Sequence, residues 1–100
     1  MTIYVGKYFY KLRKALHDEI VMHKKLNHSI VKRINELRKK QNLSWTELAY
    51  ASGISTGNIS EIRNEKIEAK VSTLCKIAIG LNIPPKEFFN FDIDLSEFDV

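Results

Sequence analysis

The stretch from Ser44 to Arg63, SWTELAYASGISTGNISEIR, contains the start signals of two helices only eleven residues apart. Ser44 is a good N-cap, and Glu47 three residues later completes the spacing of a capping box. Gly53 can adopt the left-handed conformation that ends a helix tightly, and Ser55 can cap the next helix. Two short helices joined through one glycine must cross closely and steeply. The segment therefore predicts a helix-turn-helix that holds its second helix at the surface.

The second of these helices has an unusually bare beginning. Its first turn carries Thr56, Gly57 and Asn58, which are too short to bury much area, whereas Ile59 and Ile62 are expected to point inward. Short side chains at a helix N-terminus suit the floor of a DNA major groove, where the helix approaches base edges and phosphates. The pattern indicates that this end of the helix contacts another molecule, and DNA fits it best.

Apolar residues at helical spacing run through most of the remaining chain. A stripe with steps of four, three, four and four predicts one amphipathic helix over residues 3–26. The segment LNHS at 26–29 predicts a joint, with Asn27 or Ser29 as the N-cap of a second helix that ends near Asn42. Further helices are expected over 71–81 and after Pro84 and Pro85, since proline is tolerated in a first turn. The stripe consists of Val5, Phe9, Leu12, Leu16 and Ile20.

The 100 residues fit a single domain, and their charge is unevenly placed. Residues 1–41 carry +8 and residues 42–100 carry −4, within a net charge of +4. A basic half can follow a polyanion, although solvated helix faces explain the same charges equally well. The chain has one cysteine, no secretory signal and no apolar run long enough to span a bilayer. These features predict a cytoplasmic protein without an intrachain disulfide or a membrane segment.

Other classes of site have no support in the sequence. It contains no Gly-rich phosphate loop, no nucleophile elbow and no paired carboxylates in a plausible cleft, so we expect neither an enzyme nor a cofactor. His17, His23 and His28 are six and five residues apart and lack the i,i+4 spacing of a helical metal pair. No metal site is expected.

Residues 30–89 resemble the lambda-repressor-like family of helix-turn-helix DNA-binding regulators, also called the Cro or XRE type. The resemblance rests on LSWTELAYASGISTGNISEI and, after a polar loop, VSTLCKIAIGLNIPPKEFF. It implies an all-α fold, namely a five-helix lambda-repressor-like helix-turn-helix domain, to which the apolar stripe adds an extra N-terminal amphipathic helix. The expected parts are the helix at 1–28, the DNA-binding domain at 29–90 and an acidic tail at 91–100.

The resemblance also implies which residues meet DNA. The candidate base-reading residues, at the start and on the outer face of the helix at 55–63, are Thr56, Gly57, Asn58, Ser60 and Glu61. The candidate residues for the DNA backbone are Arg38, Ser44, Trp45, Ser55, Arg63, Asn64 and Lys66. Three features depart from the family pattern. Trp45 replaces a glutamine, and its indole could donate to a phosphate or pack on a neighbour. Arginines at 38 and 63 replace an arginine–glutamate pair. In the loop, Glu65 replaces a common glycine and Ala69 a common proline.

The function implied is that of a bacterial or phage transcriptional regulator, a repressor, that binds double-stranded DNA as a homodimer. A second function also fits, namely an antitoxin or antirepressor whose main role is to bind a protein partner. Two apolar regions are candidate dimer or partner surfaces. They comprise the stripe of Val5, Phe9, Leu12, Leu16 and Ile20, and the aromatic residues Phe88, Phe89 and Phe91.

Overall fold

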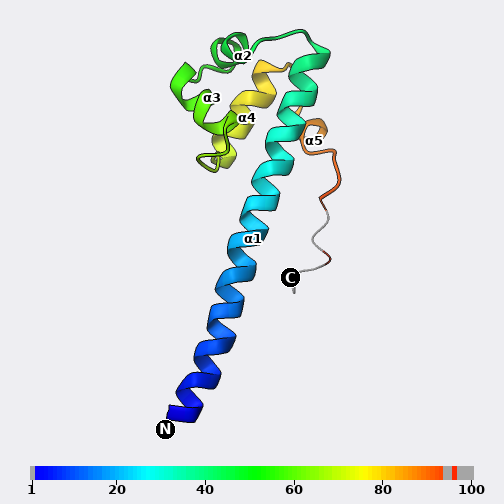
Figure 1. Ribbon diagram of the computed structural model, residues 1–100. Coiled ribbons are helices and arrows are strands. Elements are labelled where there is room, and N and C mark those ends of the chain that lie inside the picture. The colour runs from blue at the N-terminus through cyan, green and yellow to red at the C-terminus, as the bar shows by residue number, and fades with distance from the viewer. Residues whose placement is uncertain (1, 94–95, 97–100) are drawn as a thin grey trace.

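The chain folds into helices throughout the part described by the computed structural model, which covers residues 2–93 and 96, with side chains from residue 11 onward. The helices are α1 (Thr2–Lys40), α2 (Trp45–Ser52), α3 (Thr56–Arg63), α4 (Val71–Gly80) and α5 (Pro85–Phe88). Figure 1 shows α2 to α5 gathered around the C-terminal half of α1, while the N-terminal half of α1 extends away from them as a rod. The expected all-α helix-turn-helix fold is confirmed.

The core lies between α1 and the four short helices. α2 packs mainly on α4 and α3, and one face of α1 closes the cluster. The largest fully buried side chains are Ile34, Leu48, Ile62, Ile77, Leu81 and Phe88. Burial of each such side chain contributes about 1.5–3 kcal/mol. These contacts hold the two helices of the turn in place, because Leu48 belongs to α2 and Ile62 to α3.

The predicted joint at 26–29 is wrong, because α1 is one continuous helix of 39 residues. The segment contains no glycine or proline that would stop a helix. Asn27 does not cap a new helix, since its side-chain amide donates to the carbonyl of Ile67 at 3.3 Å instead. The core helix and the projecting amphipathic helix are therefore a single element. It ends in Arg38, Lys39 and Lys40, whose charges suit the negative end of the helix dipole.

α5 is a single turn that is fixed by Arg33 of α1. The guanidinium donates to the carbonyl of Phe88 at 3.1 Å and to that of Glu87 at 2.8 Å, which satisfies acceptors at the end of the turn. The turn points Phe88 inward with no exposed surface, so the prediction that this residue forms a partner surface is wrong. Phe89 packs edge-on against it and stays 41% exposed, and Phe91 is half-buried.

α2 and α4 approach each other closely at Ser52 and Gly80. A Cβ atom built on Gly80 would lie 2.9 Å from the backbone nitrogen of Ser52 and 3.0 Å from its Cα. Such distances are shorter than carbon atoms tolerate, so the glycine allows this packing. Ala49, fully buried on α2, is the other small residue of α2 in the core. The packing of α2 on α4 thus depends on a small residue that lies outside the helix-turn-helix itself.

Candidate nucleic-acid interface

The start of α2 is fixed by the predicted capping box. The hydroxyl of Ser44 accepts from the backbone N–H of Glu47 at 3.0 Å, and the backbone N–H of Ser44 donates to the Glu47 carboxylate at 3.1 Å. The hydrogen bond from the Ser44 backbone, followed by that with its side chain, lowers the pKa of the Glu47 carboxyl. The carboxylate also lies in the first turn, where the helix dipole favours negative charge.

The lowered pKa of Glu47 predicts that the free energy of unfolding depends on pH in the acid range. Because the pKa is lower in the folded chain, this group stabilises the fold fully above the ordinary carboxyl pKa that it has in the unfolded chain. The contribution is lost as the pH falls through the lower pKa of the folded state. We therefore expect the difference in unfolding free energy between wild type and Glu47→Gln to shrink as the pH falls from 6 to 3. Urea unfolding at each pH measures it, and a constant difference would contradict this role of the carboxylate.

The turn between α2 and α3 has the predicted conformation. Gly53 is left-handed, with φ of 68°, and its N–H bonds the carbonyls of Ala49 and Tyr50. Ile54 is buried beneath the turn. The hydroxyl of Ser55 then accepts from the backbone N–H of Asn58 at 3.1 Å, so α3 begins at Thr56 with its first turn capped. The sequence signals of both helix starts are confirmed.

α3 divides into a buried face and an open face. Ile59 and Ile62 are 2% and 1% exposed and fix the helix to the core. On the other side Thr56, Gly57 and Glu61 are exposed. A Cβ atom at Gly57 would meet no atom within 4 Å, so space is open beyond it. Asn58 and Ser60 are half-buried at the border between the faces. The five candidate base-reading residues therefore form one end and one side of α3.

The candidate backbone-contacting residues lie on either side of this open face. Arg63, Asn64 and Lys66 are exposed at the end of α3 and in the loop that follows. The hydroxyls of Ser44 and Ser55 are engaged in capping, as acceptors from backbone N–H groups. Positive and polar groups thus flank the open face of α3.

Arg38 is not the free, phosphate-binding side chain that the sequence predicts. Its guanidinium donates to the carbonyl of Leu43 at 2.8 Å and to the side-chain oxygen of Asn35. The same group lies 5.0 Å from the centre of the Trp45 ring, within range of a cation–π contact. Trp45 is half-buried against the core. Arg38 therefore holds the turn between α1 and α2 and supports the indole, because its donors point into the protein.

A shallow recess joins this region to the end of α3. It is lined by Trp45, Arg63, His28, Lys32, Asn35 and Glu65, together with Val31. Lys32 and Asn35 were missed as candidates from the sequence, since both lie in a helix outside the motif. The only indication in the sequence was that both residues lie close to Arg38 along the chain. The structure brings Trp45 and Arg63, from opposite ends of the helix-turn-helix, to the same recess.

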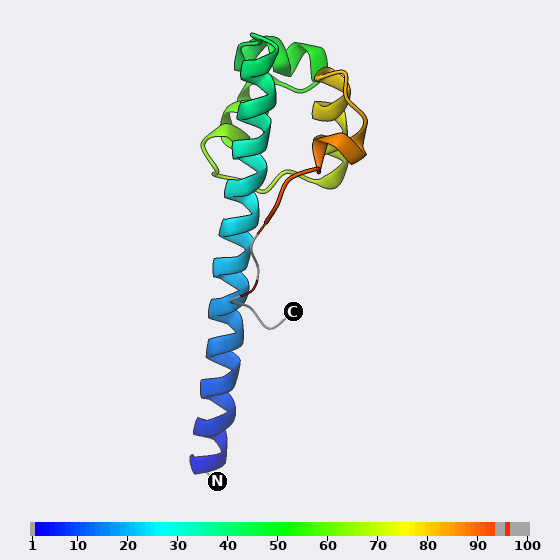
Figure 2. The same cartoon turned by 90° about the vertical axis from the view of Figure 1, so that its right-hand side faces the viewer.

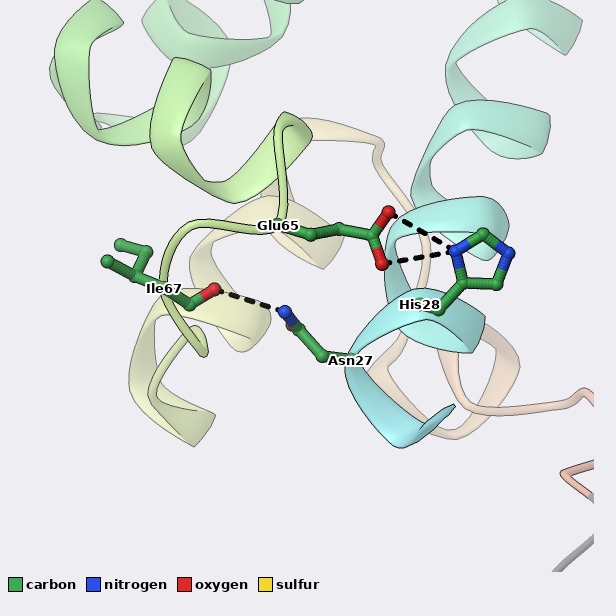
Figure 3. A network of polar contacts seen from close by, with 4 residues as sticks. All are labelled: Asn27, His28, Glu65 and Ile67. Atoms are coloured by element: carbon green, nitrogen blue, oxygen red, sulfur yellow. Dashed lines mark hydrogen bonds and ion pairs between the residues drawn. The ribbon is translucent and has the colours of Figure 1, made fainter. Parts of the chain in front are cut away.

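The loop after α3 is tied to α1 by polar contacts (Figure 3). The His28 ring nitrogen Nδ1 lies 3.1 and 3.2 Å from the two carboxylate oxygens of Glu65, and Asn27 donates to the carbonyl of Ile67. His23 lies 3.2 Å from the carboxylate of Glu68. Glu65 has a φ of 57°, the left-handed region in which the family's usual glycine is unstrained. These contacts fix the path of the loop that carries Lys66.

Comparisons with known proteins agree with this geometry. Residues 34–88 match the family model described as helix-turn-helix. The HTH-type transcriptional regulator SutR of Escherichia coli (strain K12) is 35% identical over 57 residues, which are 57% of this chain and 32% of that protein. The HTH-type transcriptional regulator PuuR of the same strain is 36% identical over 59 residues, 59% of this chain and 32% of that protein. The chain thus spans about a third of the length of these relatives.

A solved structure shares the fold. It is the crystal structure of the restriction-modification controller protein C.AhdI from Aeromonas hydrophila, with a TM-score of 0.57 and 26% sequence identity. The similarity covers 70% of this chain and 98% of that one. Within the described residues, no helix is apolar and long enough to cross a membrane, and no group of three or more His, Cys, Asp or Glu could hold a metal ion.

Proposed function

The chain belongs to the helix-turn-helix family, and from that premise we propose that it is a sequence-specific DNA-binding regulator of transcription that inserts α3 into the major groove. The observation that carries the proposal is the division of α3. Two isoleucines anchor one face in the core, while the other face carries only small or polar side chains and is open. A helix of this kind can approach base edges without moving any core residue.

The proposed base contacts follow from the chemistry of the open face. The carboxylate of Glu61 can accept a hydrogen bond from the amino group of cytosine, and the Thr56 methyl can contact that of thymine. Gly57 has no side chain and allows the backbone to come close. Asn58 and Ser60, at the border of the face, can add polar contacts. Such contacts specify sequence, because base edges differ in the major groove.

The proposed backbone contacts surround the base-reading face. Arg63, Asn64 and Lys66 would bind phosphates beyond the end of α3. The Trp45 indole N–H would donate to a phosphate at the start of α2, and we assign Arg38 the role of supporting this ring. Ser44 and Ser55 would contribute mainly by fixing the helix N-termini, where backbone N–H groups favour anions. Phosphate contacts of this kind position the domain and are insensitive to sequence.

We further propose that the protein acts as a homodimeric repressor in the cytoplasm of a bacterium or of a phage host. A dimer binds two half-sites, so it discriminates between DNA sequences better than one small interface can. The alternative is an antitoxin or antirepressor that acts mainly on a protein partner. The exposed apolar residues Leu12, Leu16 and Ile20 favour some protein contact, and both functions accommodate it.

Two substitutions separate base reading from phosphate binding. Glu61→Ala should alter preference at one base-pair position by about 1–3 kcal/mol, whereas Lys66→Ala should weaken binding to all sequences similarly and reduce its salt dependence. Selection of bound sites from random duplex DNA, followed by titrations at two salt concentrations, measures both effects. If both variants lost affinity equally for every sequence, Glu61 would not be a reader. No enriched sequence for the wild-type chain would favour the protein-partner alternative.

A further inference from the structure

The projecting part of α1 carries an apolar stripe that nothing within the described chain covers. Leu12, Leu16 and Ile20 are 57%, 51% and 56% exposed. Figures 1 and 2 show that this part of α1 lies well away from α2 to α5. Large aliphatic side chains in a row are costly to leave in water, and a helix without packing is marginally stable. The stripe therefore needs a partner.

The stripe lies on the face of α1 that the helix-turn-helix domain covers further along. Steps of three or four residues lead from Ile20 through His23 and Asn27 to Val31 and Ile34. His23 and Asn27 contact the loop at 67–68, and Val31 and Ile34 are buried in the core. One face of α1 is thus occupied by the domain in its C-terminal half and open in its N-terminal half.

The described part of the C-terminal segment does not cover the stripe. Ile93 shares a recess with Lys24, Lys25, His28 and Ser29 of α1. At about 100° per residue, the centre of this group lies on the side of the helix away from the stripe. Both views show the segment passing beside α1 (Figures 1 and 2). Ile93 therefore lies on another face of α1, and Leu12, Leu16 and Ile20 stay exposed within the described residues.

The spacing of the stripe is self-complementary. If two copies of α1 run antiparallel about a two-fold axis near Leu12, Val5 lies level with Ile20 of the other copy, and Phe9 lies level with Leu16. The two copies of Leu12 meet at the axis. Residues 5 and 9 belong to α1, and they are assigned to this pairing by helical register alone. An isologous contact of this kind closes into a dimer and uses every member of the stripe.

A parallel pairing is excluded by the place of the domain. In a parallel pair, both domains would lie at the same height and on the facing sides of the two helices, so they would collide. In an antiparallel pair centred near Leu12, the domains lie at opposite ends, beyond His23. We propose that the α1 stripe binds a second copy of this chain in antiparallel orientation. This inference rests on the homodimer of the proposed function and names its interface.

The antiparallel pair sets the distance between the two DNA-binding surfaces. With a rise of about 1.5 Å per residue, two domains centred near residue 31 would be about 55 Å apart along the paired helices. Adjacent half-sites one helical turn apart are separated by about 34–36 Å. We therefore expect the selected DNA sites to have half-sites more than one helical turn apart.

The interface is tested first by Leu16→Asp in the full chain, with His17→Asp as a matched control that adds the same charge beside the stripe. We expect sedimentation without DNA to show a dimer for wild type and for His17→Asp. For Leu16→Asp the dissociation constant should rise at least about 100-fold, because a carboxylate would be buried without a partner. Thermal unfolding should show that both variants remain folded. A monomeric wild type, or a Leu16→Asp dimer of unchanged affinity, would overturn the inference.

The orientation is tested by disulfide formation in the Cys75→Ser background. Leu12→Cys should cross-link to itself, whereas Ile20→Cys should cross-link only when mixed with Val5→Cys. Self-linking of Ile20→Cys as fast as that of Leu12→Cys would show a parallel pair and contradict the proposal. These readouts need no DNA. A monomer that binds a specific sequence would refute the interface alone, and a cross-linked dimer without sequence preference would refute the DNA-binding function alone.

Discussion

Phe88→Ala is expected to lower the free energy of unfolding by about 3–5 kcal/mol, the cost of emptying a large aromatic site in a core. Phe88 has no exposed surface, and it is the largest of the fully buried side chains. It connects α5 to α1, where Arg33 binds the carbonyls of the same turn. Small domains have about 5–15 kcal/mol of stability in total, so this one change removes a large part of it. Urea unfolding followed by circular dichroism measures the loss.

Phe89→Ala provides the matched control. This ring is 41% exposed, so its packing removes less apolar surface from water. We therefore expect its loss to lower the free energy of unfolding by less than about 1.5 kcal/mol. Similar losses for the two variants would mean that α5 does not direct Phe88 inward. Weakened dimerisation in Phe88→Ala without loss of stability would restore this residue as a partner surface.

Gly80→Ala is expected to lower the free energy of unfolding by about 1–3 kcal/mol, because it overpacks the contact between α2 and α4. The added methyl would press on the backbone nitrogen and Cα of Ser52, which cannot move aside like the end of a flexible side chain. The shift of α2 would also disturb the crossing with α3. We therefore expect both unfolding experiments and DNA titrations to detect this variant.

Gly57→Ala makes the same chemical change where the space is open. Nothing lies within 4 Å of the added Cβ, and alanine favours a helix over glycine by up to about 1 kcal/mol. Gly57→Ala should therefore stabilise the chain while weakening its specific DNA binding, because the methyl would occupy the gap between α3 and the base edges. Stabilisation with unchanged DNA affinity would place Gly57 outside the contact.

The helix-turn-helix could be predicted from the sequence because its signals are local. Ser44 and Glu47 exchange hydrogen bonds three residues apart, and Ser55 caps a backbone N–H three residues on. Gly53 adopts the left-handed turn that its lack of a side chain allows. Such interactions are decided within one turn of helix, so residue types at fixed spacing indicate them. The alternation of core and open residues along α3 is equally local.

The predictions that were wrong or incomplete depended on distant residues. Asn27 has the side chain of a capping residue, but its partner is a carbonyl forty residues away, so α1 continues. Arg38 is predicted to face phosphates. Its guanidinium instead donates to the Leu43 carbonyl and lies over the Trp45 ring. The close approach at Gly80 involves a residue in another helix. Spacing along the chain contains no information on such contacts.

Because α1 is one continuous helix, the direction in which the apolar stripe faces is fixed relative to the helix-turn-helix domain. One residue inserted between Ile20 and His23 would turn the stripe by about 100° relative to the domain, whereas seven would nearly restore the angle and add about 10.5 Å. In the proposed antiparallel dimer, insertions and deletions in this helix would therefore change where the second domain points and how far away it lies. A protein of this design could acquire a new DNA-site geometry without altering a single residue that touches DNA.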